Sequence, residues 1–288
     1  MISPRDLQKA SVLGAGQMGS GIAQVLAASG LEVQLYDVAN GALDKGIAGI
    51  DRSLRKLAEK KALSETPEAI VARIHPVREL AAIRETQFLI EAVVEKESVK
   101  VEMFQQLHKQ LDPAVIFASN TSSISITRMG SGSGRPESFV GMHFMNPAPL
   151  MKLVEVVVGL RTSPETIAFV EGLAERLGKT HVRAQDYPGF IVNRILLPMI
   201  NEAICALQDS IGTPEDIDTA MLQGTNQPMG PLALADLIGL DTVLSIMEVM
   251  HHTFGDDKYR PAPLLRRYVD AGQLGRKSGQ GFYNYAKR

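Results

Sequence analysis

Three glycines near the start of the chain have the spacing of a phosphate-binding turn. Gly14, Gly16 and Gly19 form a G-x-G-x-x-G pattern in SVLGAGQMGSGIA. Glycine is common in this chain, with 25 in 288 residues, so the surroundings of the pattern must decide its meaning. An apolar run precedes the turn, a helical pattern that includes Met18 follows it, and the next alternating run ends at Asp37. This order of strand, glycine turn, helix, strand and acid predicts a dinucleotide-binding unit.

Each part of this predicted unit has a physical role. Gly14 permits the tight turn, Gly16 lets the backbone approach a pyrophosphate, and Gly19 lets the helix pack closely on the strand. The helix N-terminus presents unpaired N–H groups and the positive end of its dipole to the phosphates. The Asp37 carboxylate would accept hydrogen bonds from a ribose 2′-hydroxyl and repel a 2′-phosphate, and no Arg or Lys follows at 38–40. The sequence therefore predicts NAD rather than NADP. The alternative is a plain turn between a strand and a helix.

A histidine and a glutamate are candidates for the base that oxidation of an alcohol requires. His143 lies near the end of the strand-like run FVGMHF, and ligands of doubly wound sheets bind beyond the carboxyl ends of the strands. Glu155 lies in the apolar run MKLVEVVVG, where a carboxylate needs a compensating partner. Bonded to one imidazole nitrogen, it would fix the tautomer and leave the other nitrogen to take a proton. The alternatives are a histidine bonded in the core and an edge-strand glutamate in water.

Two further polar side chains could hold a substrate oxygen. Ser122 lies in ASNTSSISIT, a run of hydroxyls and an amide that follows a predicted strand. The alternative for this run is a turn with a helix cap. Asn193 is a single amide among the apolar residues of GFIVNRILLP. A buried amide needs hydrogen-bond partners, and a substrate oxygen could be one of them.

A predicted helix within residues 41–64 carries a basic face. Its apolar side chains recur at intervals of three and four, as in an amphipathic helix, at Ile47, Ile50, Leu54 and Leu57. The cations on its other face are Arg52, Arg55, Lys56, Lys60 and Lys61. This face is either a solvated helix surface or a binding surface for a polyanionic ligand.

Strand and helix patterns alternate through the first two thirds of the chain. Strands are predicted within 72–77, 88–94, 115–120, 139–144, 153–159 and 180–186, with helices between several of them, for instance at 98–111 and 162–179. The fold class is therefore α/β, with a Rossmann-type, doubly wound, mostly parallel sheet. The glycine-rich GSGSG at 130–134 is expected to form a short flexible loop.

The pattern changes at Pro188 and Gly189, after which every periodic segment is helical. The predicted domains are 1–187, which holds the dinucleotide site and the basic helix, and 188–288, an all-helical domain. The helical domain is rich in Leu, Ile and Met. It would expose a large apolar surface unless it packs on the first domain or on a copy of itself.

The composition is balanced. Lys plus Arg number 30 and Asp plus Glu 32, a formal net charge of −2, so nothing indicates nucleic-acid binding. The single cysteine allows no internal disulfide and no cysteine cluster for a metal, and we predict no metal site. The apolar runs are too short to span a bilayer. The N-terminal segment resembles neither a signal nor a transit peptide. The expectation is a cytoplasmic protein without membrane contact.

Seven blocks of the sequence resemble, in this order, the short-form L-3-hydroxyacyl-CoA dehydrogenase family, and most of all its bacterial 3-hydroxybutyryl-CoA dehydrogenases. They are GAGQMGSGIA, IEAVVE, SNTSSISIT, GMHFMNPAPLMKLVE, PGFIVNRIL, PMGPLALADLIGLD and GRKSGQGFY, and the resemblance covers nearly the whole chain. It implies reversible, NAD-dependent oxidation of an L-3-hydroxyacyl-CoA to a 3-oxoacyl-CoA. It also implies a homodimer joined through the helical domain, with domain closure over the substrate.

The resemblance further implies roles for individual residues. His143 matches the family's catalytic base and Glu155 its partner. Ser122 matches the serine that holds the 3-oxygen of the substrate, and Asn193 the asparagine near its carbonyl. The residues implied to contact the cofactor are Gly14, Gly16, Gln17, Met18, Gly19, Asp37, Glu95, Lys100 and Asn146, and those implied to contact coenzyme A are Ser53 and Lys60. Met145 departs from the family, which often has phenylalanine there.

Two other functions stay open. A related dehydrogenase could act on a free hydroxy acid or sugar acid, although so small a substrate does not need five cations far from the glycine turn. The second open function is that of a non-catalytic structural protein on the same fold, like a lens crystallin. The complete set of Ser122, His143, Glu155 and Asn193 argues against lost catalysis.

Overall fold

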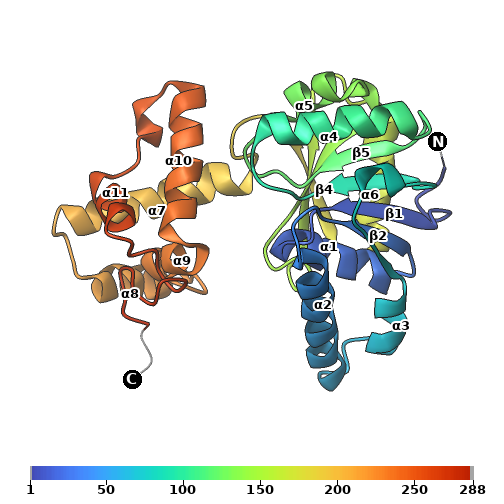
Figure 1. Ribbon diagram of the computed structural model, residues 1–288. Helices are drawn as coiled ribbons and strands as arrows, with labels where there is room; N and C mark the ends of the chain where they lie inside the picture. Colours follow the sequence, from blue (N-terminus) through green and yellow to red (C-terminus); the bar gives the residue numbers. More distant parts are fainter. Residues whose placement is uncertain (1, 286–288) are drawn as a thin grey trace. The chain divides into compact units, whose positions relative to one another are not determined.

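One eight-stranded sheet forms the centre of the N-terminal part of the chain (Figure 1). Its order is β3-β2-β1-β4-β5-β6-β7-β8, and every neighbouring pair is parallel except β6 and β7. The strands are β1 (Lys9–Leu13), β2 (Glu32–Tyr36), β3 (Ile74–Val77), β4 (Phe88–Glu91), β5 (Ile116–Ser119), β6 (Phe139–Phe144), β7 (Leu153–Val158) and β8 (Thr180–Gln185). The predicted doubly wound, mostly parallel sheet is confirmed. Its strand order reverses between β1 and β4, the point at which ligands bind in such folds.

The computed structural model describes residues 2–285, and the chain divides into two compact units, Met1–Tyr187 and Pro188–Arg288. The helices of the first unit are α1 (Gln17–Ala28), α2 (Ala42–Glu59), α3 (Pro67–Ala72), α4 (Glu97–Gln110), α5 (Ile126–Ser133) and α6 (Pro164–Arg176), with short 3₁₀ turns η1 (Leu80–Ala82) and η2 (Pro136–Ser138).

Helices cover both faces of the sheet, because its strands are apolar on both sides. Ile22 of α1 and Leu173 of α6 share one buried cluster with Ala118 of β5. Successive strand residues point to opposite faces, so Phe117 faces the other side. There its ring lies 5.3 Å from that of Phe104 on α4. This layering leaves the carboxyl edge of the sheet to the loops that carry the predicted site.

The prediction of a flexible loop at GSGSG is wrong. Residues 130–133 complete α5, and Gly134, with φ +79°, ends the helix. The glycines let α5 approach its neighbours closely. A Cβ on Gly130 would lie 3.2 Å from Cβ of Phe139, and one on Gly132 would lie 2.9 Å from Cγ1 of Val101. Small residues here serve close packing, which local composition does not distinguish from chain flexibility.

The second unit is helical, as predicted. Its helices are α7 (Val192–Gln208), α8 (Pro214–Thr225), α9 (Pro231–Ile238), α10 (Leu240–Phe254) and α11 (Pro263–Asp270), with the 3₁₀ turn η3 (Asp257–Tyr259). Gly239, with φ +101°, separates α9 from α10 within the segment 231–255. Leu232, Leu240 and Met247 belong to the apolar core of this unit.

Candidate active site

The glycine turn joins β1 to α1, and its three glycines differ in what a side chain would meet. Gly14 has φ +102°, and a Cβ there would lie 2.5 Å from the carbonyl oxygen of Ala92. A Cβ on Gly19 would lie 1.8 Å from the carbonyl oxygen of Gly14. A Cβ on Gly16, which precedes the first turn of α1, would meet nothing within 4 Å. Gly14 and Gly19 are therefore required by backbone packing, and Gly16 leaves open space in front of the helix. These residues fit a pyrophosphate at the start of α1.

Asp37 lies beside this turn, directly after β2. Its Oδ2 accepts a hydrogen bond from the backbone N–H of Ala15 at 2.7 Å, and its Oδ1 accepts one from Ala39 at 2.8 Å. Gln17, the first residue of α1, donates from Nε2 to Oδ1 of Asn146 at 3.0 Å. The half-buried Met18 packs against the core instead. Asp37 and Asn146 are thus bonded to Ala15 and Gln17, the residues on either side of Gly16.

His143 and Glu155 form a buried pair on adjacent strands. The antiparallel register of β6 and β7 places the two residues opposite each other. Nδ1 of His143 lies 2.7 Å from Oε2 of Glu155. The glutamate is 0% exposed and the histidine 8%. A carboxylate this close fixes the orientation of the imidazole ring, and burial strengthens the hydrogen bond between them.

The loop after β5 is held in place by Glu95. Its Oε1 atom accepts three hydrogen bonds: from the Thr121 hydroxyl, from the Ser122 backbone N–H at 3.2 Å and from the Ser123 hydroxyl at 3.1 Å. Oδ1 of Asn120 accepts from the Phe144 N–H at 2.8 Å, which ties the loop to β6. Within residues 2–285 the Ser122 hydroxyl has no hydrogen-bond partner.

Lys100 lies behind Glu95 in a buried charge cluster. Its ammonium is 2.5 Å from Oε1 of Glu91 and 3.0 Å from Oε2 of Glu95. Burial raises the pKa of the Glu91 carboxyl, and Lys100 and Ser119 oppose that rise. Burial alone would raise the pKa of Glu95 as well, but Lys100 and Thr121 outweigh it, so that pKa lies below its usual value. Glu91 is not among the predicted site residues, although a carboxylate in the apolar run FLIEAVV is the same kind of signal that indicated Glu155.

The fold brings most of the predicted residues to one edge of the sheet. The strands β1, β4, β5 and β6 run parallel, and their register aligns Leu13, Glu91, Ser119 and Gly141. The loops and strand ends beyond this row carry the glycine turn, Glu95, Ser122 and His143. Asn193 lies in the second unit, in the first turn of α7, so its place in the site stays a prediction.

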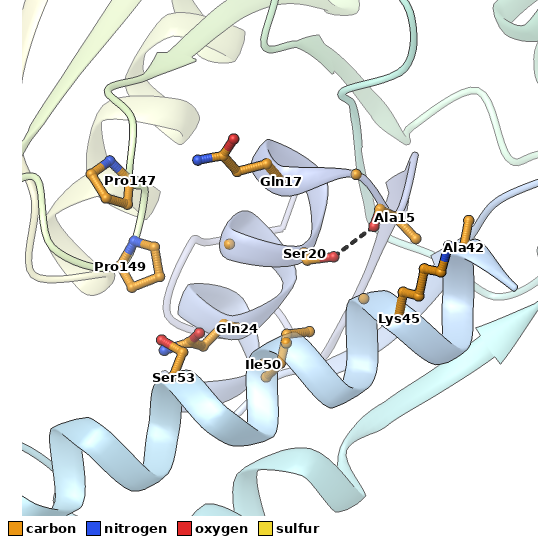
Figure 2. A pocket seen from close by; sticks show the side chains of 14 residues that line it. Ala15, Gln17, Ser20, Gln24, Ala42, Lys45, Ile50, Ser53, Pro147 and Pro149 are labelled. Carbon is orange, nitrogen blue, oxygen red and sulfur yellow. Dashed lines mark hydrogen bonds between the residues drawn. The ribbon is translucent and has the colours of Figure 1, made fainter. Parts of the chain in front are cut away.

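A groove runs along α2 from the glycine turn to the basic end of the helix. Two adjoining cavities of about 490 Å³ and 330 Å³ share Gly49, Ser53, Pro147 and Pro149 as lining residues. Figure 2 shows the larger one, bordered by α1, α2 and the segment with the two prolines. The smaller one is lined by Arg52, Lys56 and Lys60. The predicted coenzyme A contacts Ser53 and Lys60 therefore lie on one stripe of α2.

Two kinds of feature are absent from the described part of the chain. Residues 2–285 contain no group of three His, Cys, Asp or Glu side chains placed to hold a metal ion. Across the same residues, none of the helices combines the length and apolar character needed to cross a membrane.

Comparison with known proteins places the chain in a family. Residues 9–187 match the model of the 3-hydroxyacyl-CoA dehydrogenase NAD binding domain, and residues 189–285 match the C-terminal domain of the same family. The chain is similar to a "probable 3-hydroxybutyryl-CoA dehydrogenase" of Deinococcus radiodurans, with 54% identity covering 96% of this chain and 100% of the relative. A 3-hydroxybutyryl-CoA dehydrogenase of Bradyrhizobium diazoefficiens is 49% identical, over 97% of this chain and 96% of the relative.

The crystal structure of (S)-3-hydroxybutyryl-CoA dehydrogenase from Ralstonia eutropha superposes with a TM-score of 0.93. It is 47% identical and covers 98% of this chain and 100% of its own. The predictions of an enzyme and of NAD as its cofactor are confirmed by these matches. The chain belongs to the 3-hydroxyacyl-CoA dehydrogenase family.

Proposed function

We propose that this chain catalyses the reversible, NAD-dependent oxidation of an L-3-hydroxyacyl-CoA to the 3-oxoacyl-CoA, with 3-hydroxybutyryl-CoA as the first substrate to test. The observation that carries the proposal is the buried hydrogen bond between His143 and Glu155. His143 lies near the carboxyl end of β6, and the glycine turn follows the carboxyl end of β1 in the same sheet. The similar proteins named above support the choice of substrate.

In this proposal His143 is the general base. Glu155 holds Nδ1 and stabilises the charged ring, and Nε2 takes the hydroxyl proton of the substrate. Bound NAD would supply the acceptor for the hydrogen of C3 and both electrons of the C3–H bond, transferred together as hydride, and the C3–O bond would become a carbonyl. The Ser122 hydroxyl holds the 3-oxygen, and the Asn193 amide orients the thioester carbonyl. In the reverse direction the imidazolium returns its proton to that oxygen.

The cofactor residues divide by their place around the glycine turn. Gly14, Gly16 and Gly19 shape the turn for the pyrophosphate, and Gln17 and Met18 follow it on α1. Asp37 binds the adenosine ribose. Asp37 follows β2 on one side of β1, and β4 and β5 lie on the other, so in this proposal the nicotinamide lies on the side of β4 and β5 and is contacted by Glu95, Lys100 and Asn146. The Lys100 ammonium is held between two carboxylates, so we propose that it acts on this side mainly by placing Glu95.

The groove along α2 would take the coenzyme A part of the substrate. One end of the groove is lined by Gly16 and Gln17 at the glycine turn, its middle is lined by Gly49, Ile50 and two prolines, and its far end carries Arg52, Lys56 and Lys60. The apolar middle suits the extended arm of coenzyme A, and the cations suit its phosphates. A free hydroxy acid has no group that would reach this far end, which disfavours that alternative.

The experiment that tests the proposal is NADH consumption with a series of substrates. Acetoacetyl-CoA, longer 3-oxoacyl-CoAs and free acetoacetate are compared at equal concentration. We expect turnover of the thioesters and at most a trace with the free acid. Turnover of free acetoacetate at the rate of its thioester would overturn the coenzyme A assignment, and inactivity with all of them would favour the structural alternative.

We also propose a homodimer joined through the helical unit and a cytoplasmic location, as the sequence predicts.

A further inference from the structure

The amide of Gln24 on α1 opens into the groove without a protein partner. The residue is 3% exposed and lines the larger cavity of the groove. No hydrogen bond joins its amide to any residue within 2–285. The amide offers both donors and an acceptor to whatever occupies the cavity. The mechanism proposed above makes no use of Gln24.

The place of Gln24 on the helix separates it from the end of α1 that faces a pyrophosphate. It comes seven residues after Gln17, which at about 1.5 Å per residue is roughly 10 Å along the axis from the end that faces a pyrophosphate. The cavity is lined by Gln24 from α1 and by Ser53 from α2. Figure 2 shows these two side chains at one end of the cavity and Gln17 nearer the other. Gln24 therefore faces the middle of the groove, between the glycine turn and the cations.

A group that satisfies an amide here should offer a carbonyl oxygen and an N–H within an otherwise apolar chain. Between its thioester and its nucleotide, coenzyme A carries a pantetheine arm with two secondary amides. We propose that Gln24 is a specificity-determining residue that hydrogen-bonds an amide of this arm. The inference rests on the proposed acyl-CoA function and assigns a residue to the middle of the substrate.

Gly49 gives this part of the groove its width. A Cβ built there would meet only Nη2 of Arg52, at 3.9 Å, so a side chain at this position would enter the groove without hitting the backbone. The residue lies inside α2, where replacing glycine by leucine favours the helix. Gly49→Leu is therefore a variant that narrows the groove while leaving Gln24 unchanged.

The test uses three substrates that differ only in the arm. Acetoacetyl-CoA has the nucleotide and the amides, acetoacetyl-pantetheine has the amides alone, and the S-ethyl ester of thioacetoacetic acid has neither. The variants are Gln24→Leu and Gln24→Met, of which the second keeps an unbranched side chain and guards against misfolding. Loss of one neutral hydrogen bond should raise KM about 3- to 10-fold for the first two substrates. KM for the S-ethyl ester and the Kd of NADH, from its fluorescence, should not change.

A second readout is independent of turnover. Calorimetric titration with free coenzyme A should show the same weakening in Gln24→Met. Gly49→Leu should weaken the two amide-bearing substrates and spare the S-ethyl ester. An equal response of all three substrates to the Gln24 variants, or no response of any, would overturn the assignment. Failure of the proposed function looks different, because the wild type would then handle acetoacetyl-CoA no better than the S-ethyl ester.

Discussion

The hydrogen bond that Nδ1 of His143 donates to Oε2 of Glu155 gives the two nitrogens of His143 different tasks. His143→Gln should lower kcat by about 10²- to 10⁴-fold, the range of a positioned general base. The Kd of NADH should hardly change, because the imidazole is not needed to bind the cofactor. Stopped-flow kinetics and fluorescence titration measure the two quantities. A variant that keeps wild-type kcat would remove His143 from the chemistry.

Glu155→Gln keeps the size of the side chain and removes its charge. It should lower kcat, because the imidazolium that forms in the reaction loses its anion and the ring loses its fixed orientation. Glu165→Gln, on the exposed first turn of α6, is the matched control and should change nothing. Steady-state kinetics measures kcat of both variants, and an unchanged kcat in Glu155→Gln would mean that the carboxylate only packs.

Asp37 carries the cofactor preference as a charge and also braces the turn through Ala15. Asp37→Asn keeps an acceptor for that N–H and removes the repulsion of a 2′-phosphate. We expect the wild type to prefer NAD strongly. In the variant the difference in kcat/KM between NAD and NADP should be smaller, mainly because KM for NADP falls. Steady-state kinetics with both cofactors measures it. Equal efficiency of the wild type with NAD and NADP would contradict the assignment.

At the scale of elements, Glu95 links the start of α4 to the loop that carries Ser122. The carboxylate must be ionised to bind Lys100 and to accept from the loop. Its pKa lies below the usual value because Lys100 and Thr121 outweigh burial. A depressed pKa means that the stabilisation is fully present above the ordinary glutamate pKa of about 4.3 and is lost as pH falls through the folded value.

Glu95→Gln should therefore be less stable against unfolding than the wild type at neutral pH. The difference in stability between the two proteins should shrink as the pH falls below about 4.3. Thermal unfolding from pH 3 to pH 7 measures it. Glu97→Gln, two residues further on and bonded to Arg128 on the surface, is the control. A stability gap that stays constant over this range would show that the charge of Glu95 has no part in holding the loop.

The basic end of α2 should respond to charge and to salt. Lys60→Glu removes an attraction for the phosphates of coenzyme A and adds a repulsion, so KM for acetoacetyl-CoA should rise markedly. Lys61→Glu is the same charge change at a neighbouring residue that is not among those lining the groove, and it should have a smaller effect. The wild-type KM should also rise with salt, because exposed charges are screened beyond about 10 Å at 0.1 M.

Acetoacetyl-pantetheine lacks the nucleotide and should be nearly indifferent to Lys60→Glu. If both substrates respond alike, the basic face of α2 is a solvated surface. The groove assignment would then depend on its apolar middle alone.

The sequence predicted what depends on local pattern. Short-range periodicity and turn chemistry predicted the glycine turn, the approximate positions of the eight strands and the amphipathic helix α2. The pairing of His143 with Glu155 was predictable because each is polar in an apolar run, and the hairpin register then brings them together. Glu91 gave the same signal as Glu155, a carboxylate in an apolar run, but its partners Lys100 and Ser119 could not be inferred because they come from other elements. Gln24 gave no signal of its own, because its meaning depends on the cavity between α1 and α2. The last turn of α5 was mistaken for a loop because glycines in close helix packing look the same in sequence as glycines in a flexible chain.

At the scale of the whole molecule, the joint between the two units is anchored to the site. Asp186 is the last but one residue of the first unit. Its carboxylate accepts hydrogen bonds from the Ser125 hydroxyl at 2.7 Å and from the backbone N–H groups of Ile126 and Thr127. These groups begin α5, directly after the loop with Ser122. A movement of the chain at the joint would therefore reach that loop through one carboxylate.

The helical unit exposes apolar side chains that a partner could cover. Ile195 on α7 is 67% exposed and Leu237 on α9 is 48% exposed. Burial of such side chains between two copies would supply the main driving force for the proposed homodimer. We expect analytical ultracentrifugation of the wild type to give twice the chain mass, and a melting temperature that rises with protein concentration.

The double variant Ile195→Lys and Leu237→Lys should sediment at one chain mass, because two charges at the interface could not be desolvated without partners. Leu160→Lys is the matched control, since Leu160 is 86% exposed on the other unit, and it should remain a dimer. A wild type of single mass would contradict the dimer itself. A double variant that stays dimeric would instead place the interface elsewhere than at these side chains, and would leave the helical unit without the role in assembly proposed for it.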